Sequence, residues 1–139
     1  MRGISRGKPF PSLPVWTPDG SRGIEVLELL PEGGILFYVM AKCGSCVDAV
    51  AMLDSVAHSL GDNCPKVVVV TSANPDQLLE GLTGRGVTLP VWVDQQDLMS
   101  TEYNVRATRV WFRIGLDGRL EDVGVTEFNP AEYERLLRR

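Results

Sequence analysis

The sequence has few cysteines, no long hydrophobic run and no excess of positive charge. Three cysteines among 139 residues are too few for a disulfide-rich scaffold. No apolar stretch approaches the roughly 20 residues that a membrane-spanning helix needs, and the longest ones, at 35–41 and 67–70, have the length of strands. Fourteen Lys and Arg against eighteen Asp and Glu give a net charge of -4. We therefore expect neither a membrane span in this chain nor a nucleic-acid-binding surface.

The remaining composition is that of a globular protein. Hydrophobic residues make up 44% and charged residues 23% of the chain, which excludes a disordered, collagen-like or coiled-coil protein. The length predicts a single domain over 1–139. The basic segment 1–8 is not followed by an apolar segment, so we expect no intact export signal here, although a signal or anchor upstream of the given chain would leave no trace.

Four prolines precede residue 20, at positions 9, 11, 14 and 18. Proline lacks a backbone N–H and has a fixed φ, which disfavours both a helix and a central strand. We therefore predict an extended N-terminal arm over 1–23. The segment 24–30 alternates apolar with acidic residues, which indicates a short regular element but does not decide its type.

The rest of the chain alternates strand and helix patterns. The continuous apolar run at 35–41 predicts a central strand that is buried on both faces. Apolar residues at 50, 53, 57 and 60 lie on one face of a helix that begins at Cys46 and ends at Gly61. We further predict strands at 66–70, 91–93, 110–114 and 120–123 and a hairpin turn at 117–118. Helices are predicted at 75–82, with Asn74 as the N-cap, at 97–103, and from Pro130 onward, where Asn129-Pro130 repeats the Asn-Pro opening. The fold class is therefore α/β, with a central mixed sheet and helices on both faces.

The spacing of two cysteines is the most informative feature of the sequence. Cys43 and Cys46 enclose only Gly44 and Ser45, whereas Cys64 stands alone in a predicted turn and is interpreted as incidental. The pair follows a buried strand and opens a helix, where backbone N–H groups and the helix dipole favour a thiolate. We therefore predict that Cys43 attacks a substrate disulfide and that Cys46, shielded in the first turn, resolves the mixed disulfide.

Three other roles of the cysteine pair are weaker. A zinc site would have to recruit His58 and Cys64, but a helix that begins at Cys46 places His58 about 18 Å away at about 1.5 Å per residue. Haem attachment needs a histidine at position 47, which is Val47. An inert disulfide across so short a loop would add little stability. We expect no metal and no other cofactor.

Landmarks along nearly the whole chain resemble the redoxin branch of the thioredoxin superfamily. They are Gly7-Lys8-Pro9-Phe10-Pro11-Ser12-Leu13, Cys43-Gly44-Ser45-Cys46, Leu89-Pro90-Val91, Tyr103-Asn104-Val105-Arg106-Ala107-Thr108 and Asp117-Gly118-Arg119-Leu120. The order is similar to that in TlpA/ResA-type thiol-disulfide oxidoreductases and MauD-like proteins. The resemblance implies a thioredoxin-like fold and exchange with protein thiols or disulfides and a redox partner protein. We expect a monomer, and an exported or membrane-anchored location is favoured over the cytoplasm.

One position departs from this family. The family normally has a cis-proline directly after the threonine that corresponds to Thr108, whereas this chain has Arg109. A cis bond before a residue other than proline costs roughly 2.5–4 kcal/mol, so we expect a trans bond. We predict that Gly44, Ser45, Thr108 and Arg109 border the substrate groove. Arg109 either lowers the pKa of the Cys43 thiol by charge attraction or is a solvated arginine at a strand end.

Two alternative functions remain at this point. Peroxiredoxins carry an active-site arginine at about the position of Arg109, and their peroxide-reducing cysteine would then correspond to Cys46. A non-catalytic binding module could use Trp92, Trp111 and Tyr103 at an interface, although aromatic residues on a sheet more often belong to the core. Lys42, directly before the first cysteine, either tunes the thiolate or points to solvent.

Overall fold

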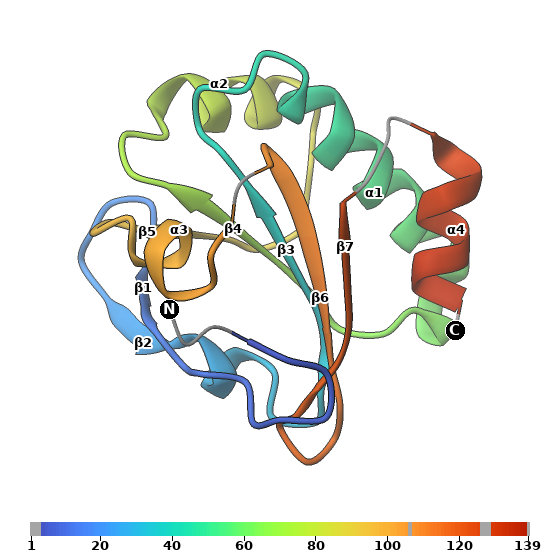
Figure 1. The fold of residues 1–139 in the computed structure, drawn as a ribbon. Helices are drawn as coiled ribbons and strands as arrows, with labels where there is room; N and C mark the ends of the chain where they lie inside the picture. Colours follow the sequence, from blue (N-terminus) through green and yellow to red (C-terminus); the bar gives the residue numbers. More distant parts are fainter. Residues whose placement is uncertain (1–3, 106, 126–128, 139) are drawn as a thin grey trace.

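A mixed seven-stranded sheet forms the centre of the computed structural model, which describes residues 4–105, 107–125 and 129–138 (Figure 1). The strand order is β2-β1-β5-β4-β3-β6-β7, in which β3, β4 and β5 run parallel and the other pairs run antiparallel. The strands are β1 (Pro14–Trp16), β2 (Gly23–Glu25), β3 (Gly34–Val39), β4 (Val67–Ser72), β5 (Val91–Asp94), β6 (Arg109–Ile114) and β7 (Leu120–Val125). Residues 1–3 of the predicted arm and Arg106 of the family landmark lie outside the described part.

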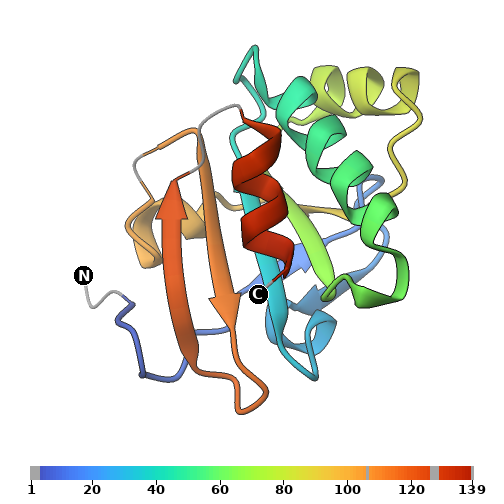
Figure 2. The same cartoon turned by 90° about the vertical axis from the view of Figure 1, so that its right-hand side faces the viewer.

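Helices cover both faces of this sheet. One face packs against α1 (Cys46–Leu60), α2 (Asp76–Gly84) and α4 (Pro130–Arg138), and the other packs against α3 (Leu98–Glu102) and a short 3₁₀ helix at Val26–Leu29 (Figures 1 and 2). Successive side chains of β3 alternate between the two layers, since Ile35 and Phe37 belong to the first core and Leu36 and Tyr38 to the second. The predicted fold class and the predicted central strand are confirmed.

The N-terminal segment is part of the sheet, so the expectation that its prolines exclude a central strand was wrong for residues 14–16. Strand β1 lies between β2 and β5, pairing Pro14 with Glu25 and Trp16 with Val93. Pro14 is tolerated because it is the first residue of the strand. Earlier in the chain, the backbone N–H of Gly7 donates to Leu120 O at 2.7 Å. The segment that was left open at 24–30 contains the end of β2 and the 3₁₀ helix.

The main helix begins and ends where the sequence predicts. Helix α1 starts at Cys46 and is followed by Gly61, whose φ is +56°. Helix α4 is capped as expected, because Asn129 Oδ1 accepts a hydrogen bond from Ala131 N at 2.9 Å. The start of α2 differs: Asn74 has a φ of +61° and Pro75 occupies the cap position, so the prediction of an Asn74 cap was wrong.

Candidate active site

The loop between β3 and α1 is anchored to the neighbouring strands. Met40 N donates to the carbonyl oxygen of Thr108, just before β6, at 3.0 Å. Ala41 N donates to Ser72 Oγ at the end of β4, at 2.8 Å. Cys43 N then donates to Met40 O at 3.2 Å. These bonds fix the position of Cys43 relative to the ends of three adjacent strands.

Cys43 and Cys46 are joined in a disulfide, but their surroundings differ. Cys46 is fully buried at the first position of α1, and its Sγ lies 3.6 Å from Thr108 O. Cys43 is half-buried and lines an open pocket of about 440 Å³, together with Ala41, Lys42, Gly44, Val47, Gln77 and Leu78. A partner can therefore reach the sulfur of Cys43, whereas Cys46 is accessible only from within the protein.

Arg109 lies beside the accessible sulfur. It is the first residue of β6, its peptide bond is trans as expected, and it pairs with Val39 of β3. Its Nη1 donates to Ser45 Oγ at 2.7 Å and lies 3.7 Å from Cys43 Sγ. Its Nε is buried and has no hydrogen-bond partner among the described residues. Arg109 is therefore packed against the cysteine pair and is not a fully solvated strand-end residue.

The structure brings the sequence-predicted site residues together, with unequal contributions. Cys43, Ser45, Cys46 and Arg109 contact one another through their side chains. Gly44 lines the pocket, and a Cβ at this position would meet no atom within 4 Å. Thr108 contributes its carbonyl oxygen, which contacts Cys46, while its side chain is exposed. Ser45 and Arg109 thus lie beside the sulfur of Cys43, and Thr108 lies beside the sulfur of Cys46.

Replacing Arg109 by Gln is expected to raise the pKa of the reduced Cys43 thiol. The guanidinium is a permanent positive charge close to the sulfur, and an opposite charge at this range favours the thiolate. We expect about three- to tenfold slower alkylation by iodoacetamide at pH 6, measured as the pH dependence of the rate in a Cys64→Ser background. Lys66→Gln, which removes a positive charge at the opposite end of the sheet, is the control. An unchanged pH profile for Arg109→Gln would exclude this role.

Ser72 and Tyr38 were missed by the sequence reasoning. Ser72 Oγ accepts the hydrogen bond from Ala41 N, and Tyr38 lines a neighbouring pocket together with Ser72. Burial raises the pKa of Tyr38 to about 12, so this hydroxyl stays neutral at physiological pH. A serine at a strand end is too common to stand out in a sequence. Only the register of β3 against β4 places it beside the cysteine loop.

The residues considered for a zinc site are separated from the cysteine pair. His58 Nδ1 lies 3.0 Å from Asp54 O, and Cys64 is a half-buried free thiol whose pKa is raised by burial. Within the described ranges, no group of three or more His, Cys, Asp or Glu side chains is placed to hold a metal ion. None of the helices described is both long enough and apolar enough to cross a membrane.

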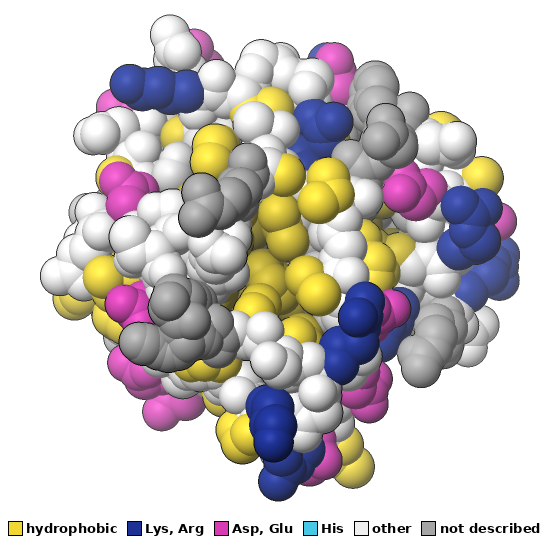
Figure 3. Space-filling view, viewed as in Figure 1, with side chains coloured by type: hydrophobic (Ala, Val, Ile, Leu, Met, Phe, Trp, Pro, Cys, Tyr) yellow, Lys and Arg dark blue, Asp and Glu magenta, His cyan; other side chains and the backbone are white. Residues whose placement is uncertain are grey.

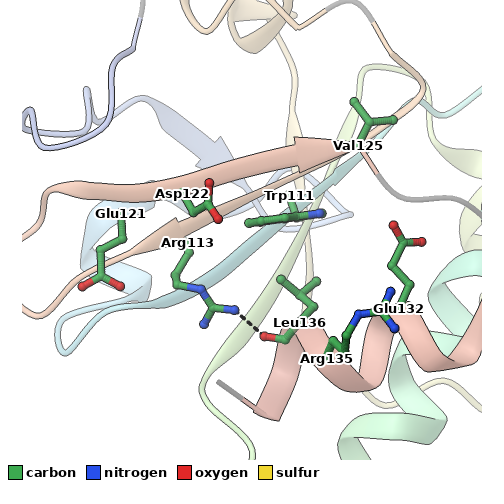
Figure 4. A pocket seen from close by; sticks show the side chains of 8 residues that line it. All are labelled: Trp111, Arg113, Glu121, Asp122, Val125, Glu132, Arg135 and Leu136. Carbon is green, nitrogen blue, oxygen red and sulfur yellow. Dashed lines mark hydrogen bonds between the residues drawn. The ribbon is translucent and has the colours of Figure 1, made fainter.

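The aromatic residues proposed for an interface have mixed surroundings. Tyr103 is buried, and its hydroxyl donates to Pro11 O at 2.5 Å. Trp92 is half-buried against the core. Trp111 is half-buried and lines a groove of about 410 Å³ between β6, β7 and α4, where Arg113 donates to Leu136 O at 2.5 Å (Figure 4). Tyr103 and Trp92 therefore serve mainly in packing.

A second hollow is apolar. Figure 3 shows hydrophobic side chains gathered at the centre of the face that is viewed in Figure 1. A cavity of about 350 Å³ lies here beside β6 and β7 and is lined by Ile4, Tyr103, Asn104, Val105, Ala107, Val110, Phe112, Val123 and Val125. The cysteine pair does not contribute to its wall. Of these two cavities, only the pocket described above is lined by Cys43.

Comparisons with solved structures show the fold. No protein-family model and no curated protein sequence matches the chain. A Chlorobium tepidum protein assigned as thiol:disulfide interchange protein DsbE has 18% identity and a TM-score of 0.78, covering 96% of this chain and 94% of that one. StoA from Bacillus subtilis has 16% identity and a TM-score of 0.69 over 91% and 96%. A secreted Mycobacterium tuberculosis disulfide oxidoreductase has 14% identity and a TM-score of 0.71 over 88% and 92%.

These three similarities extend over nearly the full length of each compared protein. A further similar structure, at 17% identity and a TM-score of 0.71, is a thiol:disulfide interchange protein of the thioredoxin family from Chlorobium tepidum, and 96% of each chain is covered. The chain therefore has a thioredoxin-like fold, and the expectation drawn from the redoxin resemblance is confirmed for the architecture.

Proposed function

We propose that this protein is a thiol-disulfide oxidoreductase that acts on protein cysteines through Cys43 and Cys46. The observation that carries the proposal is the asymmetry of the pair: Cys43 lines an open pocket beside a guanidinium, and Cys46 is fully buried behind it. Proteins of this activity among the similar structures support the proposal.

The reaction requires both sulfurs in sequence. In the reduced protein, the Cys43 thiolate attacks one sulfur of a substrate disulfide, forms a mixed disulfide and releases the other substrate sulfur as a thiolate. Cys46 loses its proton and attacks Cys43 Sγ, which forms the Cys43–Cys46 disulfide and releases the second substrate thiolate. Two electrons thus pass from the protein to the substrate. The same steps in reverse oxidise a substrate dithiol, and a redox partner protein restores the starting state.

The site favours exchange over peroxide reduction. A peroxidase mechanism through Cys46 would need peroxide to reach a sulfur that is fully buried. It would also need Arg109 to face that sulfur, whereas the contact of Arg109 Nη1 is with Cys43 at 3.7 Å. Both observations support Cys43 as the attacking sulfur.

The partners and location follow from the same assignment. We propose protein thiols and disulfides as substrates and an extracytoplasmic location, which is supported by the secreted Mycobacterium tuberculosis protein of the same fold. We also propose that the protein acts as a single domain and as a monomer, because one chain supplies both cysteines, Ser45 and Arg109. TlpA/ResA-like or MauD-like character remains part of this proposal.

The proposed function predicts a reversible two-electron couple for Cys43 and Cys46. The protein, with Cys64 replaced by Ser, is equilibrated with reduced and oxidised glutathione, and the reduced fraction is measured by thiol alkylation and mass spectrometry. Its potential relative to glutathione then gives the direction of exchange. Peroxide consumption is followed on the same sample, with Cys43→Ser as the control. Rapid peroxide turnover would instead establish a peroxidase, and the lack of a reversible couple would leave a binding module.

A further inference from the structure

Positive charge surrounds the accessible sulfur. Arg109 contacts Cys43 Sγ on one side, and Lys42 is exposed and lines the pocket on the other side. Within the described part of the chain, neither cation forms an ion pair with a carboxylate. The carboxylate in the first turn of α1, Asp48, is already paired with Arg85. The seven residues lining the pocket include no acidic side chain.

This local charge is opposite to that of the whole protein, which has a formal net charge of -4. A small positive region next to the reactive atom, in a protein whose net charge is negative, attracts anionic groups to that point and repels cationic ones. On the Lys42 side, Asp97 lines an adjacent pocket together with Lys42, and its Oδ1 accepts a hydrogen bond from Ala73 N. Because the charge of Asp97 opposes that of Lys42, Arg109 contributes more than Lys42 to the attraction of anionic groups.

The guanidinium of Arg109 has donors to spare. Of its five N–H donors, the one on Nε is buried, and the other four belong to Nη1 and Nη2, which form a planar fork that suits a carboxylate. Its hydrogen bonds in the described structure, to Ser45 and Cys43, both use Nη1. A carboxylate next to the attacked sulfur could therefore bind this side chain without breaking a strong existing ion pair.

We infer that the preferred substrate is a polypeptide segment whose cysteine is flanked by carboxylates, and that Arg109 determines this preference. The inference rests on the proposed function and adds the substrate class. Arg109 acts here on the substrate's charge. This is separate from its effect on the pKa of Cys43, because a change in the thiolate fraction alters the rate for every substrate by the same factor.

The test compares three disulfide-linked peptide dimers, of Ac-Glu-Cys-Glu-NH₂, Ac-Gln-Cys-Gln-NH₂ and Ac-Lys-Cys-Lys-NH₂. Their reduction by the reduced protein is followed at one pH and about 10 mM ionic strength, where charges are screened over about 30 Å. We expect the Glu dimer to react on the order of tenfold faster than the Lys dimer, after division by their rates with neutral dithiothreitol. In about 1 M salt, where the screening length is about 3 Å, the preference should largely disappear.

The variants separate charge from structure. Arg109→Gln should reduce the ratio of Glu to Lys rates by about threefold or more, and Lys66→Gln should leave it unchanged. Arg109→Lys keeps the charge but loses the fork, so it should retain more of the ratio than Arg109→Gln does. A ratio unaffected by Arg109→Gln would overturn the inference while leaving the function intact. No reduction of the Gln dimer would instead refute the proposed function. Faster reaction with oxidised glutathione than with the Glu dimer would overturn the assignment to a polypeptide.

Discussion

The Cys46→Ser variant is expected to accumulate as a covalent mixed disulfide with its substrate, while Cys43→Ser loses disulfide exchange. Removal of the buried sulfur leaves the accessible Cys43 able to attack, but nothing can release the bound partner. Removal of Cys43 leaves only a sulfur that a partner cannot reach. We expect Cys43→Ser to lower the exchange rate by about 10³-fold or more, since the remaining thiol of the pair, Cys46, is fully buried.

The measurement uses the peptide dimers and a reduced, Cys64→Ser background. Non-reducing mass spectrometry should show a stable adduct of one peptide on Cys46→Ser, located at Cys43 by digestion. The double variant Cys43→Ser/Cys46→Ser is the matched control and should carry no adduct. An adduct formed by Cys43→Ser in preference to Cys46→Ser would reverse the roles of the two sulfurs and revive the peroxidase alternative.

The sequence predicts the centre of the fold well because its signals are purely local there. The run at 35–41 is apolar at every position and rich in β-branched and aromatic residues, which is typical of a strand covered on both faces, and β3 is that strand. The apolar period of α1 and the glycine after Leu60 define both ends of the helix. In these segments, propensity, pattern and capping all agree.

The N-terminal region is less predictable, since its structure depends on distant partners. Residues 14–16 form a strand because they pair with β2 and β5. A local analysis of the sequence detects the high density of prolines, which argues against a strand, and does not detect these pairing partners. Asn74 is a second example. Its side chain type is typical of a helix cap, but it adopts a positive φ, which asparagine tolerates better than most residues. The residue type alone does not show whether an asparagine caps a helix or adopts a positive φ.

The candidate site also has a part that the sequence predicts and a part that only strand pairing explains. The cysteine spacing predicts disulfide exchange, and the resemblance predicts that Thr108 and Arg109 border the groove; in the structure both residues contact the cysteine pair. The pairing of Val39 with Arg109 is what brings a residue 66 positions away to the Cys43 sulfur. Ser72 arrives in the same way through β4, with no sequence signal of its own.

Phe37→Ala is expected to cause the largest loss of stability outside the site. Phe37 is fully buried at the middle of β3, and its ring meets that of Tyr133 on α4 edge to face, with centroids 6.0 Å apart. Truncation leaves a cavity between the sheet and α4 and costs about 3–5 kcal/mol, a large part of the about 5–15 kcal/mol typical of whole proteins. Urea denaturation of the disulfide form measures this, with Leu116→Ala, which is 77% exposed, as the control.

The same variant separates the fold from the chemistry. The hydrogen bonds that position Cys43 involve Met40, Ser72 and Thr108, whereas the ring of Phe37 packs against Tyr133 on α4. At low temperature and without denaturant, folded Phe37→Ala should therefore keep the wild-type pH profile of Cys43 alkylation. A stability loss below about 1 kcal/mol would show that the sheet and α4 close the cavity by moving together. A shifted alkylation profile would show that the packing of α4 on β3 also sets the geometry of the cysteine loop.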